Sequence, residues 1–345
     1  MVSDDMKKFE TIPAISVVIP TYNIENYIDQ TLNSILNQTF KDYEVIVIDD
    51  CSTDKTVDVV KTFLPRFDGK LQIHRLKKNS SEDDSAPRNF GLGYSRGKYI
   101  FFLDGDDLIT PDAFEKLYNA AEKFQADMVS TTRFYRFKDR GVIPEQNELI
   151  LSDSKPNGIK EPTIVEDGVL KRAQMYVKEM IYEYIWNKLI RRDFLIEHDI
   201  TFPKMLLRED SVFSFECYCL SKCVLIPDVL NLYRRTRIGS VTNSANSTAE
   251  KMTDDKIRKY INCTIIGAKE FYNFMQRIDE FKDEPKIQYD VIRHYIKVNF
   301  NWLITKVYSQ ISAEKVFQIF TEEFLKDPAG YAPAAAVIFN MANGK

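Results

Sequence analysis

Ile15-Ser16-Val17-Val18-Ile19-Pro20 decides the fold, because the same pattern returns further along the chain. An apolar, β-branched run that stops at a proline is typical of a buried strand, and the polar Thr21-Tyr22-Asn23 is typical of its exit loop. Tyr43–Ile48 is a second dense apolar run, and Tyr99–Leu103 is the most apolar of all. We therefore expect these segments to be buried strands.

Helical patterns separate these strands. Apolar residues recur every three or four positions after the first strand, at Ile28, Leu32, Ile35 and Leu36, and after the second, at Val57, Val60 and Phe63. We expect Asn23 to cap the first of these helices. Thr110-Pro111 supplies an N-cap and a first-turn proline for a later helix through Phe114 and Leu117.

Weaker signals complete the alternation: a strand at Leu71–Leu76, a helix from about Pro87 to Ser95 and a strand at Met128–Phe137. Strands that alternate with helices in this way predict a mainly parallel sheet with helices on both faces. Ligands of such sheets bind beyond the carboxyl ends of the strands. Both acidic clusters described below follow such ends.

The rest of the chain has a different pattern. Residues 138–163 are rich in Gly, Pro, Asn and charge, which indicates a loop, and Glu166–Leu220 is mostly helical in pattern. An Arg-rich stretch at Tyr233–Thr242 and a polar linker place a boundary near residue 245. We expect residues 246–345 to form a C-terminal helical region with aromatic faces. These faces would pack on the rest of the protein, bind another subunit or form a surface toward a ligand.

Charge and cysteine content narrow the class of protein. A net charge of −4 and a pI near 5.7 argue against binding to nucleic acid, which normally needs a basic surface. The five cysteines are an odd number, and a polar N-terminus lacks the apolar core of a signal peptide. We expect a cytoplasmic protein. Cys217, Cys219 and Cys223 lack the spacing and the second half of a metal site, so we expect them to be buried apolar residues.

The strongest chemical signal is Asp104-Gly105-Asp106-Asp107, directly after the most apolar strand. These carboxylates repel one another, and no basic residue is near them in the sequence, so we expect a divalent cation to neutralise them. Oxygen ligands suit Mg²⁺ or Mn²⁺, which would bridge a diphosphate. The alternative is that the acids only cap the turn.

Two further polar groups lie at comparable places. Asp49-Asp50 ends the second strand, where the base or ribose of a nucleotide lies in folds of this kind. Pro87-Arg88-Asn89 begins a helix, where a guanidinium and free backbone amides bind anions. Ser52 or Asp54 suffices to cap the next helix, so capping does not explain Asp49-Asp50.

Together these segments resemble the inverting glycosyltransferases of GT-A fold known as family 2. The resemblance is carried by Val17–Asn23, Val47–Asp54, Pro87–Asn89 with Gly91, and Phe102–Asp107, whose order and spacing match. It covers roughly residues 13 to 240. It implies a GT-A catalytic domain over 1–245, with a nucleotide half at about 13–137 and an acceptor half at about 164–242.

The resemblance also assigns residues. It implies nucleotide binding, most often of uracil, by the first exit loop and the Asp pair, and metal binding by Asp106 with Asp104. The implied nucleotide-binding residues are Pro20, Tyr22, Asn23, Asp50, Arg88, Asp104 and Asp106. Arg234, Arg235, Arg237 and Ser240 resemble the family's mobile phosphate loop.

The family's base is an acid in a Glu-Asp pair at a helix start, and Glu209-Asp210 matches it. In a single displacement the acceptor hydroxyl attacks from the face opposite the diphosphate, so a carboxylate must take its proton there. The resemblance implies that Asp210 is this base. Asp107, Glu209 and Trp186 are candidates for the donor or acceptor side, although Trp186 is equally well explained as a core anchor.

We therefore expect a metal-dependent enzyme that transfers one sugar per encounter from a nucleotide-sugar, most simply a UDP-sugar. The acceptor would be a glycan, a lipid-linked glycan or a polyol phosphate of the bacterial surface. Association with the inner face of the membrane and self-association through the C-terminal helices stay open. The alternatives are a nucleotidyltransferase, which would need a Gly-rich loop after the first strand, and a non-catalytic module on a degenerate fold. A dinucleotide oxidoreductase lacks its Gly-x-Gly-x-x-Gly motif here.

Overall fold

The computed structural model describes residues 12–80, 85–139, 142, 144–152, 158–165, 168–181, 183–205, 207–235, 253–307, 312–329, 332, 334–335 and 337–338. A single sheet forms its centre, with the strand order β3-β2-β1-β4-β9-β6-β10-β5. Short strands β7 and β8 pair with β6 and β10 at its side. The strands are β1 (Ile15–Thr21), β2 (Tyr43–Asp49), β3 (Leu71–Arg75), β4 (Tyr99–Phe102), β5 (Leu108–Ile109), β6 (Met128–Lys138), β7 (Ile150–Leu151), β8 (Thr163–Ile164), β9 (Lys188–Arg191) and β10 (Cys223–Arg235).

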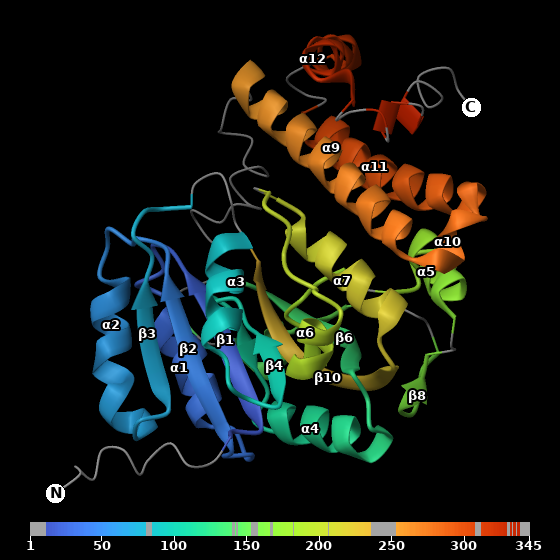
Figure 1. Ribbon diagram of the computed structural model, residues 1–345. Helices are drawn as coiled ribbons and strands as arrows, with labels where there is room; N and C mark the ends of the chain where they lie inside the picture. The colour runs from blue at the N-terminus through green and yellow to red at the C-terminus, as the bar shows by residue number, and fades with distance from the viewer. Residues whose placement is uncertain are drawn as a thin grey trace, which may run out of the picture.

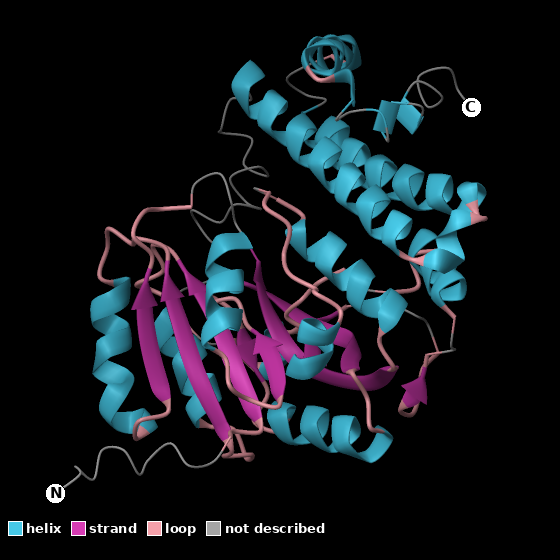
Figure 2. Cartoon of the chain, in the orientation of Figure 1, coloured by secondary structure: helices cyan, strands magenta, loops and turns pink. Residues whose placement is uncertain are grey.

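The first part of this sheet follows the predicted pattern. Strands β3, β2, β1 and β4 pair in parallel, so β1, β2 and β4 end at one edge (Figure 2). Because successive residues of a strand face opposite sides, Val17 and Ile19 join one core and Val18 joins the other. The expected α/β class with a mostly parallel sheet between helices is confirmed.

Helices cover both faces (Figure 1). The helices of the nucleotide half are α1 (Ile28–Leu36), α2 (Thr56–Phe63), α3 (Ser85–Tyr94) and α4 (Ala113–Phe124), and those of the acceptor half are α5 (Val169–Val177), α6 (Arg192–Glu197) and α7 (Glu209–Leu220). Helix α3 approaches β1 closely at Gly91, where an added Cβ would lie 2.3 Å from a methyl group of Val18.

Two local predictions were wrong. Helix α1 begins only at Ile28, because Asn23 adopts a left-handed conformation and its side chain binds a neighbouring loop instead of capping the helix. Helix α4 begins at Ala113 after Asp112, to whose carboxylate the Thr110 hydroxyl donates.

The largest difference lies in the acceptor half. The segment expected to be mostly helical contains strand β9, which pairs antiparallel with β4 and β6 inside the sheet. Strand β10 was missed altogether and runs parallel to β6. A strand as short as Lys188–Arg191 is stabilised by two neighbouring strands, which its own sequence does not reveal.

The C-terminal region is helical, as expected, with α9 (Asp254–Arg277), α10 (Asp279–Lys282), α11 (Pro285–Val307) and α12 (Ala313–Lys326). Helix α9 packs on α7, and α11 packs on α5 and α9 (Figure 1). Phe271 of α9 contacts Tyr176 and Phe215, and all three belong to one continuous core with Val18 and Phe102. The described C-terminal helices therefore share the core of the acceptor half, while the polar boundary near residue 245 lies outside the described residues.

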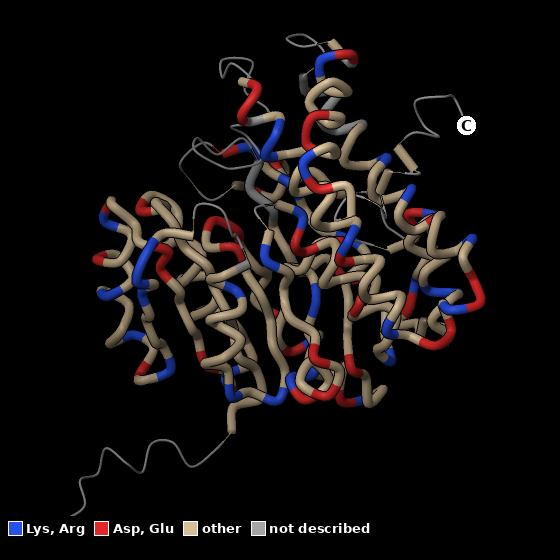
Figure 3. The backbone as a smooth tube through the Cα atoms, turned by 45° about the horizontal axis from the view of Figure 1, so that its top comes forward, with Lys and Arg blue, Asp and Glu red and all other residues tan. Residues whose placement is uncertain are grey.

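Cys217, Cys219 and Cys223 are buried, as predicted for small core residues. All five cysteines are free, and Cys263 is also buried. None of the described helices combines the length and the apolar character needed to cross a membrane. Acidic and basic residues are interspersed over the chain (Figure 3).

Candidate active site

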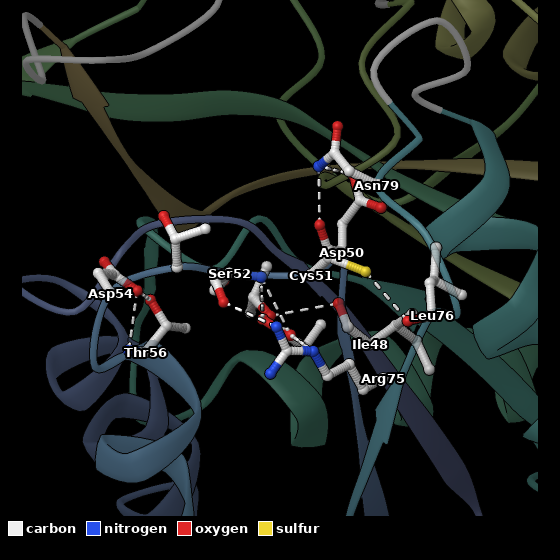
Figure 4. Close-up of polar contacts among 12 residues, drawn as sticks. Ile48, Asp50, Cys51, Ser52, Asp54, Thr56, Arg75, Leu76 and Asn79 are labelled. Carbon is white, nitrogen blue, oxygen red and sulfur yellow. Dashed lines mark hydrogen bonds and ion pairs between the residues drawn. The ribbon is translucent and has the colours of Figure 1, made fainter.

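The exit loops of β1 and β2 are fixed to each other. The Asn23 side-chain oxygen accepts the backbone N–H of Thr53 (2.8 Å), and the Asn23 N–H donates to the Ser52 hydroxyl (3.0 Å). Close by, Asp54 accepts the N–H and the hydroxyl of Thr56 (Figure 4). Asn23 therefore holds the loop on which Pro20 lies partly exposed and Tyr22 is 47% exposed.

The structure separates the two residues of the Asp49-Asp50 pair. Asp49 is fully buried, accepts the Ser52 N–H (3.1 Å) and lies 3.3 Å from the Arg75 guanidinium, so its role is structural. Asp50 points the other way, toward Asn79 (Figure 4). Its carboxylate accepts from the Asn79 amide (3.1 Å) and from the backbone N–H (2.8 Å) and hydroxyl (2.7 Å) of Ser80. Asp50 therefore lies in a polar loop cluster.

The turn after β4 carries the second acidic group. Thr31 donates to the Gly105 carbonyl (2.9 Å), and an added Cβ at Gly105 would lie 2.5 Å from the Ile24 side chain. A larger residue here would displace the end of the Ile24 side chain and press on the first exit loop. Asp107 is buried, and its N–H donates to the Asp104 carbonyl, whereas the carboxylates of Asp104 and Asp106 are partly exposed.

Arg88 connects this turn to the acceptor half. Its guanidinium lies 2.8 Å from the Asp104 carboxylate and 2.6 Å from that of Glu209. The premise that no basic residue offsets the acids was therefore wrong for Asp104, since helix α3 brings Arg88 across from a distant part of the sequence. Among the described residues, no three His, Cys, Asp or Glu side chains form a ready-made metal site.

Asp210 lies in the first turn of α7, beside the Arg88–Glu209 ion pair. Arg208, in a left-handed conformation, precedes the helix. Burial raises the pKa of Asp210, the charges of Arg208 and Arg88 oppose this rise, and those of Glu183 and Asp104 add to it. The residue as a whole is half-buried, and a raised pKa suits a carboxylate that takes up a proton.

Sequence reasoning missed two charged residues beside Asp210. Glu183 accepts from the Ser211 hydroxyl of α7 (2.9 Å). Lys188 on β9 is fully buried, donates to the Asn187 side chain (2.9 Å) and the Tyr184 carbonyl, and burial lowers its pKa to about 7 against the charges of Cys217 and Asp210. The only signal for Lys188 was its place beside the apolar pair Leu189-Ile190, which fits a buried strand.

Trp186 packs between Phe134 of β6 and Tyr184. Its indole is 5% exposed, meets Phe134 edge to face and stacks on Tyr184 with centroids 4.9 Å apart. Tyr184 is the exposed ring of this pair. A sugar on this side would thus meet Tyr184 before Trp186.

The expected phosphate loop is only partly described. The backbone of Arg234 and Arg235 belongs to β10, whereas Arg237 and Ser240 lie outside the described residues.

The chain resembles solved glycosyltransferase structures in its fold. Its structure aligns with TarS residues 1–349 of S. aureus in complex with UDP, with a TM-score of 0.60 and 20% sequence identity, covering 96% of this chain and 92% of TarS 1–349. This likeness extends into the C-terminal helices and identifies the GT-A fold.

Two relatives of similar sequence are both named as transferases that act on poly(ribitol phosphate). The chain is 28% identical over 277 residues to the poly(ribitol-phosphate) beta-N-acetylglucosaminyltransferase TarP of Staphylococcus aureus strain N315, covering 79% of this chain and 75% of TarP. It is 29% identical over 215 residues to the poly(ribitol-phosphate) beta-glucosyltransferase of Bacillus spizizenii, covering 61% of this chain. The chain spans only 30% of the length of that second relative.

The family model of glycosyl transferase family 2 matches residues 16–199. This range includes both exit loops, Arg88, the acidic turn after β4, Glu183 and Lys188, and ends before α7. The match covers more than half of the chain, and the chain belongs to glycosyl transferase family 2.

Proposed function

We propose that this protein transfers one sugar per encounter, with inversion, from a UDP-sugar to a polyol-phosphate or glycan acceptor of the bacterial surface. The observation that carries the proposal is the Arg88 bridge. One guanidinium joins Asp104, on the donor side, to Glu209, the residue before the proposed base. The donor phosphates and the proposed base would thus lie on opposite sides of the Arg88 guanidinium.

The donor side follows from the exit loops. The proposed nucleotide-binding residues are Pro20, Tyr22, Asn23, Asp50, Arg88, Asp104 and Asp106. Of these, Tyr22 is exposed and Asp50 lies at the edge of the sheet, where nucleotides bind in parallel α/β folds. Arg88 offers the planar fork that phosphate oxygens accept.

On the acceptor side, Asp210 would remove the proton of the attacking hydroxyl. Burial raises the pKa of Asp210, and a carboxylate with a raised pKa is a stronger base than an ordinary one. Arg88 holds Glu209, and the first turn of α7 fixes where Asp210 lies. The names of the TarP and B. spizizenii relatives favour a poly(ribitol phosphate) acceptor.

A divalent cation, Mn²⁺ or Mg²⁺, fits Asp106 and Asp104 as a site shared with the donor. Both residues are partly exposed, and their carboxylate oxygens, which Mg²⁺ and Mn²⁺ prefer as ligands, would hold the cation. When bound, such a cation offsets the charge that develops on a departing nucleoside diphosphate.

The test is transfer from UDP-Glc, UDP-Gal, UDP-GlcNAc and UDP-GalNAc to poly(ribitol phosphate), with Mn²⁺, Mg²⁺ or EDTA. Saturable UDP release that depends on the acceptor supports the proposal. Binding of a sugar polymer without turnover of any donor would instead support a non-catalytic module. Asp106→Ala should weaken UDP binding in Mn²⁺ and change it little in EDTA, and an equal loss in both would remove the cation from Asp106.

A further inference from the structure

A polar cluster lies behind the proposed base, where α7 meets the C-terminal helices. The Ser211 hydroxyl donates to the Glu183 carboxylate (2.9 Å), and the Ser214 hydroxyl donates to the Glu183 backbone carbonyl (2.7 Å). These bonds fix Glu183 against the first two turns of the helix that carries Asp210. Arg208 directly precedes this helix.

Two buried tyrosines enter the cluster from other helices. Tyr176 comes from α5 and Tyr295 from α11, they are 2% and 1% exposed, and both rings contact Phe271 of α9. Gly267 of α9 makes room for the Tyr295 hydroxyl, since an added Cβ there would lie 2.0 Å from it. Within the described part of the chain, neither hydroxyl makes a hydrogen bond of normal geometry.

The same charged residues act on both tyrosine hydroxyls. Burial raises the pKa of Tyr176 well above its ordinary value, and the charge of Glu183 raises it further. Burial also raises the pKa of Tyr295, where Arg208 opposes the rise and Glu183 and Asp210 add to it. Both hydroxyls therefore lie within the field of Glu183 and Arg208.

A buried hydroxyl that makes no hydrogen bond is costly, and phenylalanine would fill the same space without that cost. The Glu183 carboxylate has acceptor capacity beyond the one bond from Ser211. We propose that Tyr176 and Tyr295 are positioning residues, whose hydroxyls hold Glu183 and Arg208 in place, directly or through an ordered water, and so fix Asp210.

This inference rests on the proposed role of Asp210 as base. It makes the C-terminal helical region part of the catalytic apparatus, because α11 supplies Tyr295 and α9 supplies the gap at Gly267 that admits it. Both tyrosines are buried, so they would act through Glu183 and Arg208. The expected signature is therefore a change in turnover with little change in donor affinity.

The experiment compares Tyr295→Phe and Tyr176→Phe with Tyr43→Phe in the full chain. Tyr43 is a matched control, because it is a buried tyrosine on β2 whose hydroxyl donates to the Ile35 carbonyl. Each cluster variant should lower kcat about tenfold, the rate equivalent of one hydrogen bond to a charged group, with an unchanged KM for the donor. Tyr43→Phe should lower the Tm and leave kcat unchanged.

Wild-type kcat in both cluster variants would overturn the inference. The Tm gives a second readout that needs no activity, since a hydroxyl that makes its bond lowers the Tm when removed. A raised or unchanged Tm in both variants would also overturn it. A wild-type protein that turns over no UDP-sugar counts against the proposed function instead, and the Tm comparison still decides whether the hydroxyls are bonded.

Discussion

Both the nucleotide half and the acceptor half place acidic side chains at an edge of the sheet, but different contacts hold these side chains in the two halves. In the nucleotide half, Asp49 is held by Ser52 on its own loop and Arg75 on β3, and Asp50 is held by Asn79 and Ser80 in the loop after β3. In the acceptor half, Asp210 is surrounded by charges from α3, the segment before β9, and β9 itself. The first arrangement depends on adjacent strands, and the second on tertiary packing.

The largest test removes residues 249–345. If the acceptor half needs the C-terminal helices, the shortened chain exposes aromatic residues such as Tyr176 and Phe215, at a cost on the order of 2 kcal/mol each. We expect a protein that aggregates or unfolds without cooperativity, as seen by gel filtration and thermal melting. A monomeric truncation that melts cooperatively and binds UDP like the full chain would show that the halves are separable from these helices.

Asp210→Asn tests the acceptor half alone. Transfer should fall by at least about 10²-fold, the lower range for loss of a positioned base, while UDP affinity stays the same. Glu216→Gln is the control, because it removes another buried carboxylate from the same helix, next to Arg277. If Asp210→Asn turns over like the wild type, another group must accept the proton.

Arg88→Lys tests the link between the halves. A lysine keeps the charge but cannot reach Asp104 and Glu209 with one planar fork, so kcat/KM should fall by roughly tenfold to 100-fold. The matched control is Arg96→Lys, which alters an arginine–carboxylate pair with Glu44 inside the nucleotide half. Equal activity losses in the two variants would mean that Arg88 acts only through stability.

Lys188 gives the smallest expected effect, a pH dependence of stability. Its pKa of about 7 in the folded state lies below its unfolded value, so between these values the unfolded chain binds more protons and stability rises with pH. From pH 7 to 9 the wild type should gain about 2 kcal/mol relative to Lys188→Met, measured by urea unfolding. Lys61→Met, at an exposed lysine, should show no such difference. Parallel curves for Lys188→Met and wild type would mean that Lys188 stays charged when buried.

The contrast between the two halves also explains which parts of the fold and of the candidate site the sequence predicts. In the nucleotide half each strand is a dense apolar run that ends in polar residues, so the parallel sheet and the places of Asp50, Asp104 and Asp106 follow from local patterns. The partner of Asp104 does not, because Arg88 reaches it only after α3 packs on β1.

In the acceptor half, local patterns fail for a physical reason. β9 is held by β4 and β6 on either side, and Lys188 on it resembles an exposed residue in the sequence although the fold buries it completely. Glu183 and Tyr295 lie far apart in the chain and approach only when α11 packs on α5. Asp210 was found through the family motif, whereas its surroundings required the structure.

If Arg88 binds the donor diphosphate as proposed, the two substrates do not bind independently. A guanidinium that turns toward a diphosphate must loosen its hold on Asp104 or Glu209, and the first turn of α7 responds to that change. Thermodynamic linkage then requires that donor and acceptor alter each other's affinity by the same factor. Occupancy of the nucleotide site would thus be communicated to the acceptor site through a single side chain.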